Sequence, residues 1–438
     1  MVETGHRTQE RKEGERVILV GVLLPQSPDT YEEPLEELGR LAATAGGIEV
    51  GRVTQRRQRP TASTYLGKGK AMEIAELARE TDAEVVLVDA DLSPAQLRNL
   101  ERLFSCRVVD RTELILDIFA LHARTYQAKL QVELAQAQYL LPRLKRMWTH
   151  LNREGGTGQS AAIGTRGPGE KQIEIDRRLL RRRISELIAE LKQIEARRKR
   201  MAESRSEFFT VSLVGYTNAG KSTLLRRLTG STTYIADQLF ATLDTQTRSW
   251  PLPGNKQVFL SDTVGFIRDL PHHLVASFNA TLEEVRAANL ILHVIDGSHP
   301  DAQLHMDAVE QVLEGLVDKD TPRIAVFNKF DRVEDPLDVR LLAAGFENSV
   351  FCSATTGEGI DALTDAVVKH IHDAQMEARF TVPVSAGKLL AFLADRGTVL
   401  DRDYDGSEVS VRVRLSARDL ARADRIAHEH GWRDGTTD

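Results

Sequence analysis

The chain contains little cysteine. Only two of its 438 residues are cysteines, Cys106 and Cys352, and each lies in a short apolar stretch typical of a strand. Two thiols so far apart in the sequence are expected to remain reduced and buried, which argues against a disulfide-stabilised protein. No group of cysteines and histidines has the spacing of a metal site.

Long apolar segments are also missing from the sequence. No run of about eighteen apolar residues occurs, so we expect no membrane-spanning helix. The segment 1–15 is charged and polar and lacks the apolar core of a secretory signal. We therefore expect a soluble, cytoplasmic protein, with a monomer as the default state.

The chain has no large excess of charge of either sign. Its formal net charge is −6, so the molecule as a whole does not attract nucleic acid. Any binding to RNA must depend on local basic patches. The hydrophobic content of 41% and the length are sufficient for two or more domains, each with its own core.

Hydrophobic patterns divide the chain into five parts. Strand and helix patterns alternate in two regions, which predicts two α/β domains. Between them, apolar residues recur at steps of 4 and 3 from Leu130 to Trp148, and a similar seam follows a glycine-rich segment, which predicts an antiparallel helical hairpin. The expected parts are a tail (1–15), an N-terminal α/β domain (16–125), the hairpin (126–206) with its tip at 154–169, a second α/β domain (207–375) and a small α+β domain (376–438).

The segment 215–222, GYTNAGKS, follows an apolar strand pattern and precedes a helical one. This context is the one that a phosphate-binding loop requires, because glycines let backbone N–H groups surround phosphate oxygens at a helix N-terminus. Lys221 is expected to reach the β- and γ-phosphates, and Ser222 to ligate Mg²⁺. The predicted contacts are Gly215, Tyr216, Thr217, Asn218, Ala219, Gly220, Lys221, Ser222 and Thr223.

Further short motifs, which we call boxes, follow in order, each at the end of an apolar strand pattern. Asp262 is expected to hold Mg²⁺ through water, and Gly265 to offer its N–H to the γ-phosphate. Asp331 can accept two hydrogen bonds from guanine, which adenine does not offer in this arrangement. The predicted contacts are Asp262, Thr263, Val264 and Gly265, then Asn328, Lys329 and Asp331, then Ser353, Ala354 and Thr355. Together the boxes predict a P-loop GTPase domain with a mostly parallel sheet, like that of the translation-factor-like GTPases.

A threonine between the first two boxes should close over Mg²⁺ and the γ-phosphate. Thr242 is the first choice, with Thr245 and Thr247 as alternates, and the predicted contacts here are Phe240, Ala241, Thr242, Leu243 and Asp244. We expect Lys221, Thr242 and Gly265 to act in catalysis. Where many GTPases have a glutamine that orients water, this chain has Phe266, so intrinsic hydrolysis should be slow. His272 and His273 follow as weaker candidate helpers.

Several motifs resemble the HflX family of ribosome-associated GTPases over residues from about 16 to 375. They include the segments 64–70 (TYLGKGK), 110–112 (DRT), 129–135 (KLQVELA), 164–170 (GTRGPGE), 240–244 (FATLD) and 262–275 (DTVGFIRDLPHHLV). The resemblance implies binding to the large ribosomal subunit, GTP hydrolysis stimulated there, and dissociation or rescue of stalled ribosomes under stress. The segment 66–70 lacks the full spacing of a second phosphate loop and is interpreted as a basic turn before a helix, with a weak nucleotide or RNA contact left open.

The second arm of the hairpin is rich in arginine. These side chains are either a solvated face paired with nearby acids or contacts to RNA phosphates. The candidate RNA contacts are Arg166 at the tip and Arg177, Arg178, Arg181 and Arg182 on the arm.

Two other function classes remain open from the sequence. One is a GTPase switch in ribosome assembly or in RNA maturation or modification, although the sequence offers no second catalytic group. The other is a binding scaffold with a degenerate nucleotide site, against which the intact Lys221, Ser222, Asp262 and Asp331 argue.

Overall fold

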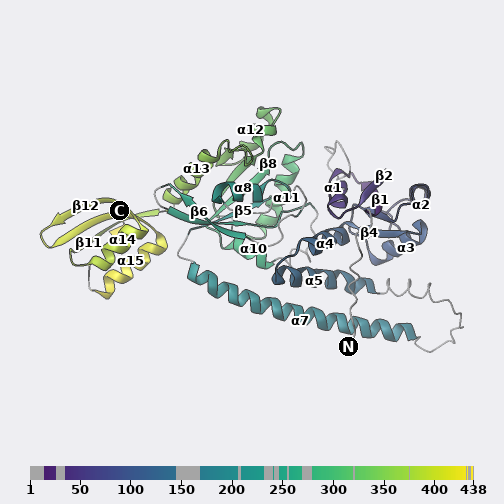
Figure 1. Ribbon diagram of the computed structural model, residues 1–438, viewed down its shortest axis with the longest axis horizontal. Helices are drawn as coiled ribbons and strands as arrows, with labels where there is room; N and C mark the ends of the chain where they lie inside the picture. The colour runs from purple at the N-terminus through teal and green to yellow at the C-terminus, as the bar shows by residue number, and fades with distance from the viewer. Residues whose placement is uncertain are drawn as a thin grey trace. The chain divides into compact units, whose positions relative to one another are not determined.

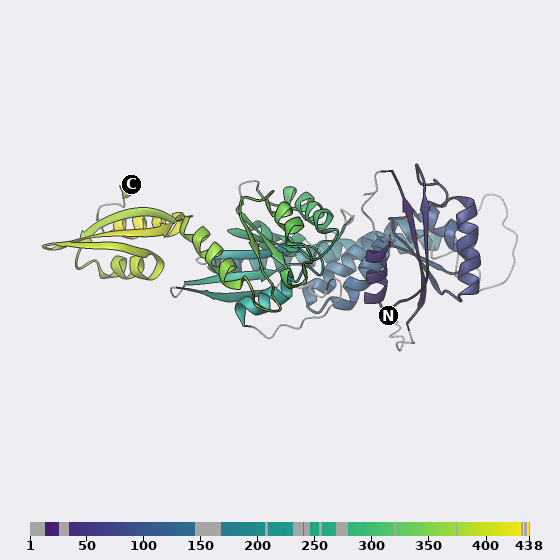
Figure 2. The ribbon, with the colours of Figure 1, turned by 90° about the horizontal axis from the view of Figure 1, so that it is seen from above.

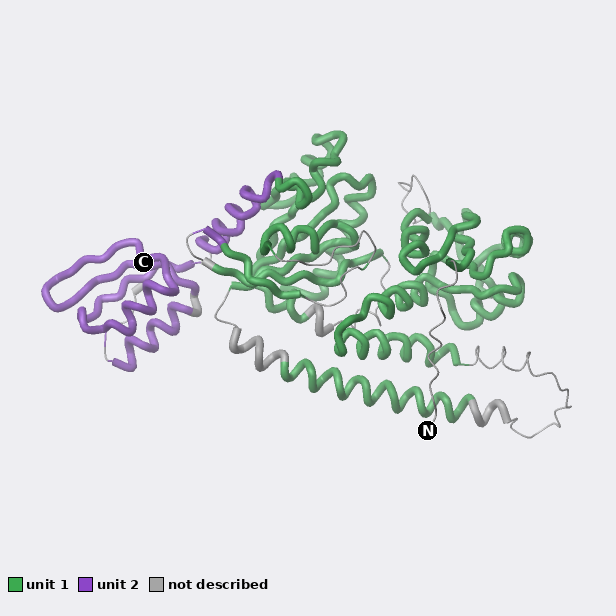
Figure 3. Tube along the Cα trace, in the orientation of Figure 1, with its two compact units in different colours: residues 1–251, 257–357 green, residues 252–256, 358–438 purple. Residues whose placement is uncertain are grey.

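The structure is a computed structural model, and contacts divide it into two compact units (Figure 3). The first unit comprises residues 1–251 and 257–357, and the second comprises residues 252–256 and 358–438. The residues that the structure describes are 14–25, 35–144, 168–205, 209–230, 240, 246–253, 256–268, 279–318, 321–373, 375–430, 432 and 436–437.

The first unit begins with a four-stranded parallel sheet in the order β2-β1-β3-β4. Side chains alternate between its two faces, so Leu19 lies in one core cluster, and Ile18 and Val20 lie in another. A parallel sheet buried on both faces explains the dense apolar runs in these strands. The strands are β1 (Arg16–Leu23), β2 (Ile48–Arg56), β3 (Val85–Val88) and β4 (Arg107–Asp110).

Helices cover both faces of this sheet (Figure 2). Helix α3 begins with a capping box between Ser93 and Gln96 and with Pro94 in its first turn. The helices are α1 (Glu36–Thr44) and α4 (Arg111–His122) on one face, and α2 (Lys68–Glu80) and α3 (Pro94–Phe104) on the other.

Helices α5 (Tyr126–Leu140) and α7 (Pro168–Arg205) lie side by side (Figure 1). Leu130 and Leu134 of the predicted seam pack against the fully buried Leu187. The α-helix ends at Leu140 and a 3-10 turn, η1 (Leu141–Arg143), follows, because a proline within that turn lacks an N–H for the helical pattern. Trp148 and most of the predicted tip lie outside the described residues, and α7 begins within the range assigned to the tip.

A six-stranded sheet in the order β10-β9-β8-β5-β7-β6 forms the rest of the first unit. Within this sheet the neighbouring strands β10, β9, β8, β5 and β7 are parallel to one another, which confirms the mostly parallel sheet. The strands are β5 (Phe209–Gly215), β6 (Gln246–Leu252), β7 (Lys256–Asp262), β8 (Leu290–Asp296), β9 (Arg323–Asn328) and β10 (Ser349–Phe351). The helical elements are α8 (Lys221–Thr229), α10 (Asn279–Arg286), α11 (Ala302–Glu314), η2 (Phe330–Arg332) and α12 (Pro336–Ala343).

The second unit contains the small α+β domain that the sequence predicts. Its sheet is antiparallel, with the strand order β12-β13-β11-β14. Leu389 and Leu393 of α14 and Ala423 of α15 share a core with Phe380 and Val411 of the sheet. The elements are α13 (Ile360–Asp373), β11 (Gln375–Pro383), α14 (Gly387–Arg396), β12 (Thr398–Asp405), β13 (Glu408–Ser416), α15 (Ala417–Glu429) and β14 (Thr436–Thr437).

Candidate guanine-nucleotide site

The loop from Gly215 to Gly220 joins β5 to α8 and has the backbone that a phosphate cradle requires. Asn218 and Gly220 adopt left-handed φ angles of 60° and 95°. A Cβ atom at Gly220 would also collide with the side-chain amide of Asn328, so both conformation and space require glycine there. The loop therefore turns sharply into the N-terminus of α8, where anions are favoured.

Lys221 is buried beside this loop and is only 6% exposed. Its Nζ donates hydrogen bonds to the carbonyl oxygens of Gly215, at 3.0 Å, and Tyr216, at 2.8 Å. Burial lowers the pKa of Lys221 to about 8, and the nearby carboxylate of Asp262 opposes that shift. The loop thus holds an ammonium group next to the predicted phosphate position.

Ser222 and Asp262 bring two oxygen donors together. The Ser222 hydroxyl donates to Asp262 Oδ2 at 2.6 Å, and Asp262 is fully buried at the end of β7. A hydroxyl and a carboxylate are hard oxygen ligands that suit Mg²⁺, so the residues fit this ion. Within the described residues no cluster of three or more His, Cys, Asp or Glu side chains could hold a metal by itself. A Mg²⁺ ion here would therefore need further ligands from nucleotide and water.

The segment after β7 pairs directly with the phosphate loop. Thr217 N–H donates to the carbonyl of Phe266 at 2.7 Å, and Phe266 N–H donates to the carbonyl of Gly215 at 3.1 Å. A Cβ atom at Gly265 would lie 2.8 Å from the Cα of Thr217, so only glycine allows this approach. Movement of this segment must therefore disturb the phosphate loop.

Phe240 marks the other predicted switch segment. Its backbone N–H donates to the Thr217 hydroxyl at 3.0 Å, and its side chain is 2% exposed. Thr247 lies in β6, and its hydroxyl donates to Glu284 at 3.4 Å. The other predicted switch residues lie outside the described part of the chain: Ala241, Thr242, Leu243, Asp244, Thr245, His272 and His273.

Asn328 connects the phosphate loop to the last predicted box. Its Nδ2 donates to the Ala219 carbonyl at 2.8 Å, and its Oδ1 accepts the Ala354 N–H at 3.0 Å. The residue is 2% exposed, so its amide group connects the two loops and is not accessible to a ligand. Arg227 of α8 adds a further contact, donating to the Ala354 carbonyl at 3.1 Å and also to that of Thr355.

Lys329 and Asp331 lie at the expected edge of the sheet. Lys329 Nζ pairs with Asp296 Oδ2 at 2.7 Å, and Asp331 lies exposed on η2. Ser353 is fully buried, and its hydroxyl accepts the Thr356 N–H at 3.1 Å. Asp296 was not predicted as a site residue, although it ends the apolar strand β8 just as Asp262 ends β7.

An ionic cluster that was not predicted from the sequence joins the N-terminal sheet to the nucleotide site. Arg111 of α4 pairs with Glu37 and Asp89, both at 2.7 Å, and also donates to the Arg268 carbonyl at 3.2 Å. Glu37 accepts the Tyr216 hydroxyl, and that hydroxyl accepts the Arg268 N–H at 2.9 Å. Burial opposes the charge of Arg111, but the two carboxylates outweigh it and raise its pKa above the ordinary value.

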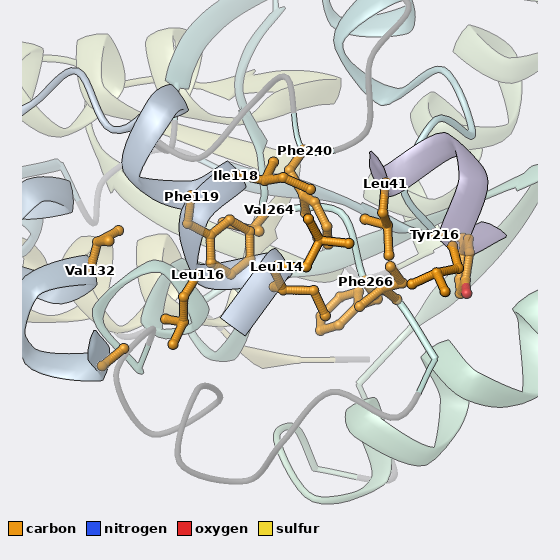
Figure 4. Close-up of a cluster of buried hydrophobic side chains, with 14 of the residues drawn as sticks. Leu41, Leu114, Leu116, Ile118, Phe119, Val132, Tyr216, Phe240, Val264 and Phe266 are labelled. Atoms are coloured by element: carbon orange, nitrogen blue, oxygen red, sulfur yellow. The ribbon is translucent and has the colours of Figure 1, made fainter. Parts of the chain in front are cut away.

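An apolar cluster lies beside these ions (Figure 4). The rings of Phe119 and Phe240 meet edge to face with centroids 4.6 Å apart. Phe266 is 5% exposed and lies in the same cluster, together with Leu41 and Leu114 of the N-terminal helices. Both predicted switch segments therefore bury a phenylalanine against the N-terminal domain. Arg111 lies in the motif DRT at 110–112, the signal that could have pointed to this contact.

A cleft lies between α1 and the phosphate loop. Its lining includes Glu37, Arg40, Thr217, Asn218 and His305. The ring of His305 stacks on that of the loop tyrosine with centroids 3.8 Å apart. Burial lowers the pKa of His305 to about 3, so this ring is neutral and packs as an uncharged wall of the cleft.

The described arginines of the hairpin are mostly exposed. Arg178 and Arg181 are exposed, Arg177 is half-buried and lies 4.0 Å from Glu174, and Arg182 pairs with a glutamate one turn later at 3.0 Å. Both interpretations of this arm, a salt-bridged face and an RNA contact, are compatible with these positions. Arg166 lies outside the described residues.

The phosphate loop, the buried carboxylate and the base-side boxes lie at one edge of a parallel sheet. This arrangement defines a P-loop GTPase. Family models match the chain as "GTP-binding GTPase N-terminal" at 32–120, "GTP-binding GTPase Middle Region" at 122–205, "50S ribosome-binding GTPase" at 210–329 and "HflX C-terminal domain" at 338–431. The chain belongs to the HflX family of GTPases.

Two curated relatives illustrate the extent of the similarity. GTPase HflX of Escherichia coli (strain K12) is 45% identical over 415 residues, which cover 93% of this chain and 95% of that protein. GTPase HflX of Caldanaerobacter subterraneus subsp. tengcongensis is 42% identical over 407 residues, which cover 92% of each. Among the described residues no helix combines the length and apolarity needed to cross a bilayer.

Proposed function

We propose that this protein uses its GTPase cycle to control binding to the large ribosomal subunit, and that it dissociates or rescues stalled ribosomes under stress in the cytoplasm. The observation that carries the proposal is the burial of both switch phenylalanines, Phe240 and Phe266, against the N-terminal domain. A matching family model described as "50S ribosome-binding GTPase" supports the choice of partner.

Among the groups of the proposed chemistry, Lys221, Ser222 and Asp262 lie close together. Lys221 would neutralise charge on the β- and γ-phosphates, while Ser222, Thr242 and, through water, Asp262 would hold Mg²⁺. The bound ion would neutralise the charge that develops on the phosphates during hydrolysis. Gly265 would donate its N–H to the γ-phosphate. Asp331 would accept hydrogen bonds from guanine, with Lys329 packed along the base and the Ala354 N–H beside the guanine oxygen.

The position of Phe266 supports slow intrinsic hydrolysis. The side chain that stands where many GTPases have a glutamine is buried among apolar groups, so it does not orient an attacking water. We infer that contact with the ribosome completes the site by rearranging this segment. We therefore expect the large subunit to stimulate hydrolysis.

A conformational change at the nucleotide can be transmitted to the N-terminal domain through a few contacts. The γ-phosphate would draw Thr242 and Gly265 toward itself, and each is close in sequence to a phenylalanine packed against α4. Closing the switches must therefore repack or shift that contact, because a dense core has discrete arrangements. This supports the N-terminal domain and hairpin as the parts whose ribosome contact depends on GTP.

The experiment that tests the proposed function measures GTP turnover with and without purified large ribosomal subunits. We expect turnover to rise at least tenfold with large subunits and to stay near its basal rate with small subunits. Asp262→Asn serves as the site control, because it removes the carboxylate paired with Ser222 and should abolish both rates. Turnover that large subunits leave unchanged would contradict the proposal and favour a role in RNA maturation, and no turnover at all would favour a binding scaffold.

A further inference from the structure

The loop that follows β10 carries the backbone N–H group that the proposed function places beside the guanine oxygen. We call residues 352–357 the base loop. Cys352, at its start, is buried, and its carbonyl accepts the Phe330 N–H at 3.1 Å. Thr355 and Thr356 are exposed. Burial therefore holds only the first half of the base loop, and the second half needs other contacts to keep its shape.

Arg227 of α8 supplies contacts to this second half. Its Nε donates to the Ala354 carbonyl at 3.1 Å, and its Nη2 donates to the Thr355 carbonyl. A Cβ atom at Gly357 would lie 3.5 Å from Arg227 Cζ, so the guanidinium packs closely against the turn. Because the planar guanidinium presents its donors in a fixed geometry, one side chain can orient two successive carbonyls.

The hydrogen bonds of the base loop fix the directions of its peptide groups. The Ser353 carbonyl accepts the Gly357 N–H at 2.8 Å, and the two following carbonyls accept from Arg227. The Ala354 N–H donates to Asn328 Oδ1 at 3.0 Å, and the amide of Asn328 also contacts the phosphate loop. The base loop therefore offers an N–H on the side of the nucleotide boxes, while its next two carbonyls are directed to α8.

We propose that Arg227 is a positioning residue for guanine recognition, which sets the preference for an oxygen at position 6 of the base. This inference rests on the base-side part of the proposed function, in which the Ala354 N–H contacts that oxygen. A backbone N–H donates to an oxygen but finds no acceptor in the amino group that adenine has there. Without Arg227 the two carbonyls would lose their partner, and the exposed half of the loop would no longer hold the N–H toward the base.

The test compares GDP with two analogues, using the full-length protein. In 6-thio-GDP a sulfur, which is a weaker hydrogen-bond acceptor, replaces the oxygen, and the groups that donate to Asp331 remain. Inosine diphosphate keeps the oxygen and lacks the 2-amino group that donates to Asp331. The ratio of the GDP and 6-thio-GDP affinities therefore reports on the contact with Ala354, and the ratio of the GDP and inosine diphosphate affinities reports on Asp331. All affinities are measured by competition against a fluorescent guanine nucleotide.

The variant Arg227→Met keeps an unbranched side chain and removes both donors. We expect its affinity for GDP to fall about tenfold and its preference for GDP over 6-thio-GDP to fall at least about threefold. Its preference for GDP over inosine diphosphate should stay within about twofold of the wild-type value. Arg227→Lys retains a cationic donor and should give intermediate values. An equal loss of affinity for all three nucleotides would show general destabilisation and overturn the inference.

The matched control is Arg226→Met. Arg226 precedes Arg227 on α8 and is also exposed, and its side chain makes no hydrogen bond with the part of the chain that the structure describes. This variant should bind all three nucleotides as the wild-type protein does. If Arg227→Met does not fold, Arg227→Lys decides by the same ratio.

The outcomes separate the inference from the proposed function. If the wild-type protein prefers GDP to 6-thio-GDP and the Arg227 variants keep that preference, the inference is wrong and the proposed function stands. A wild-type protein that prefers GDP to ADP but not to 6-thio-GDP would also overturn the inference, and would leave the role of Asp331 intact. If the wild-type protein binds GDP no more tightly than ADP, the guanine site and the inference both fail.

Discussion

At the residue scale, Lys221 combines burial with a charge that the phosphates require. Its pKa of about 8 means that the free protein increasingly holds a neutral amine above pH 8. Bound phosphate favours the ammonium form, so binding above this pH must take up a proton. We expect the affinity for GDP to change by less than about twofold between about pH 7 and pH 8 and to fall several-fold between about pH 8 and pH 9, measured by titration calorimetry.

Guanosine is the control for this pH dependence, because it carries the same base without phosphates. Its affinity for the protein should show only the effect of the base's own ionisation. A GDP affinity that changes no more with pH than that of guanosine would show that Lys221 keeps its charge in the free protein.

Asp331 is exposed on η2, at the end of the base-side box. Asp331→Asn replaces one acceptor with a donor, which matches xanthine better than guanine. We expect the variant to lose at least about a hundredfold in GDP affinity and to gain affinity for xanthosine diphosphate, measured by competition binding. An unchanged preference would remove Asp331 from base recognition.

At the scale of elements, the contact between α4 and the nucleotide site depends on Arg111. Arg111→Met leaves the half-buried carboxylates of Glu37 and Asp89 with only their longer pairs to Arg268, both at 3.4 Å, and we expect it to destabilise the first unit by about 1 to 3 kcal/mol. The measurement is urea unfolding. Arg40→Met is the control: its pair with Glu36 on α1 is largely exposed, so it should change stability by about 0.5 kcal/mol or less. Equal effects would contradict the structural role of the cluster.

The hairpin offers a matched pair on a single helix. Leu187 is fully buried in the seam with α5, whereas Leu179 is 57% exposed on α7. Leu187→Ala should destabilise the first unit by about 2 to 5 kcal/mol through lost burial and a cavity, and Leu179→Ala by well under about 1 kcal/mol. If chemical denaturation showed similar losses for both, the seam between α5 and α7 would be wrong.

Most elements could be predicted from the sequence where the local pattern is decisive. Buried parallel strands such as β3 and β9 have dense apolar runs, and α3 carries its own capping signals at Ser93 and Pro94. The phosphate loop was recognisable because its glycines, lysine and serine occur at fixed spacing between a strand and a helix. Strand β12 is not predictable in this way, because its residues are mostly exposed and do not alternate between apolar and polar.

The contact between the N-terminal domain and the switch segments could not be predicted from the sequence. Its members, Glu37, Asp89, Arg111, Tyr216 and Arg268, are spread over more than two hundred residues, and no local period links them. The sequence alone also does not reveal that Phe266 is buried, because a phenylalanine at this position is equally compatible with a surface loop. Such a contact is a product of tertiary packing, which local propensity does not encode.

At the scale of the whole molecule, nucleotide state should alter a helix that touches no nucleotide. If GTP repositions Phe240 and Phe266, amide hydrogens of α4 should exchange faster with a non-hydrolysable GTP analogue than without nucleotide. Hydrogen exchange with mass spectrometry measures this effect. Helix α2 is the internal control, since it packs in a separate cluster on the opposite face of the sheet and should not change. Identical exchange of α4 in both states would separate the N-terminal domain from the nucleotide switch.

The most direct measurement of the central claim is co-sedimentation of the full-length protein with separated ribosomal subunits. Each subunit is tested with a non-hydrolysable GTP analogue, with GDP and without nucleotide. The proposed function predicts strong binding to the large subunit with the GTP analogue and at least tenfold weaker binding in the other two states. Equal binding in all three states, or a preference for the small subunit, would contradict the claim that GTP controls this partner.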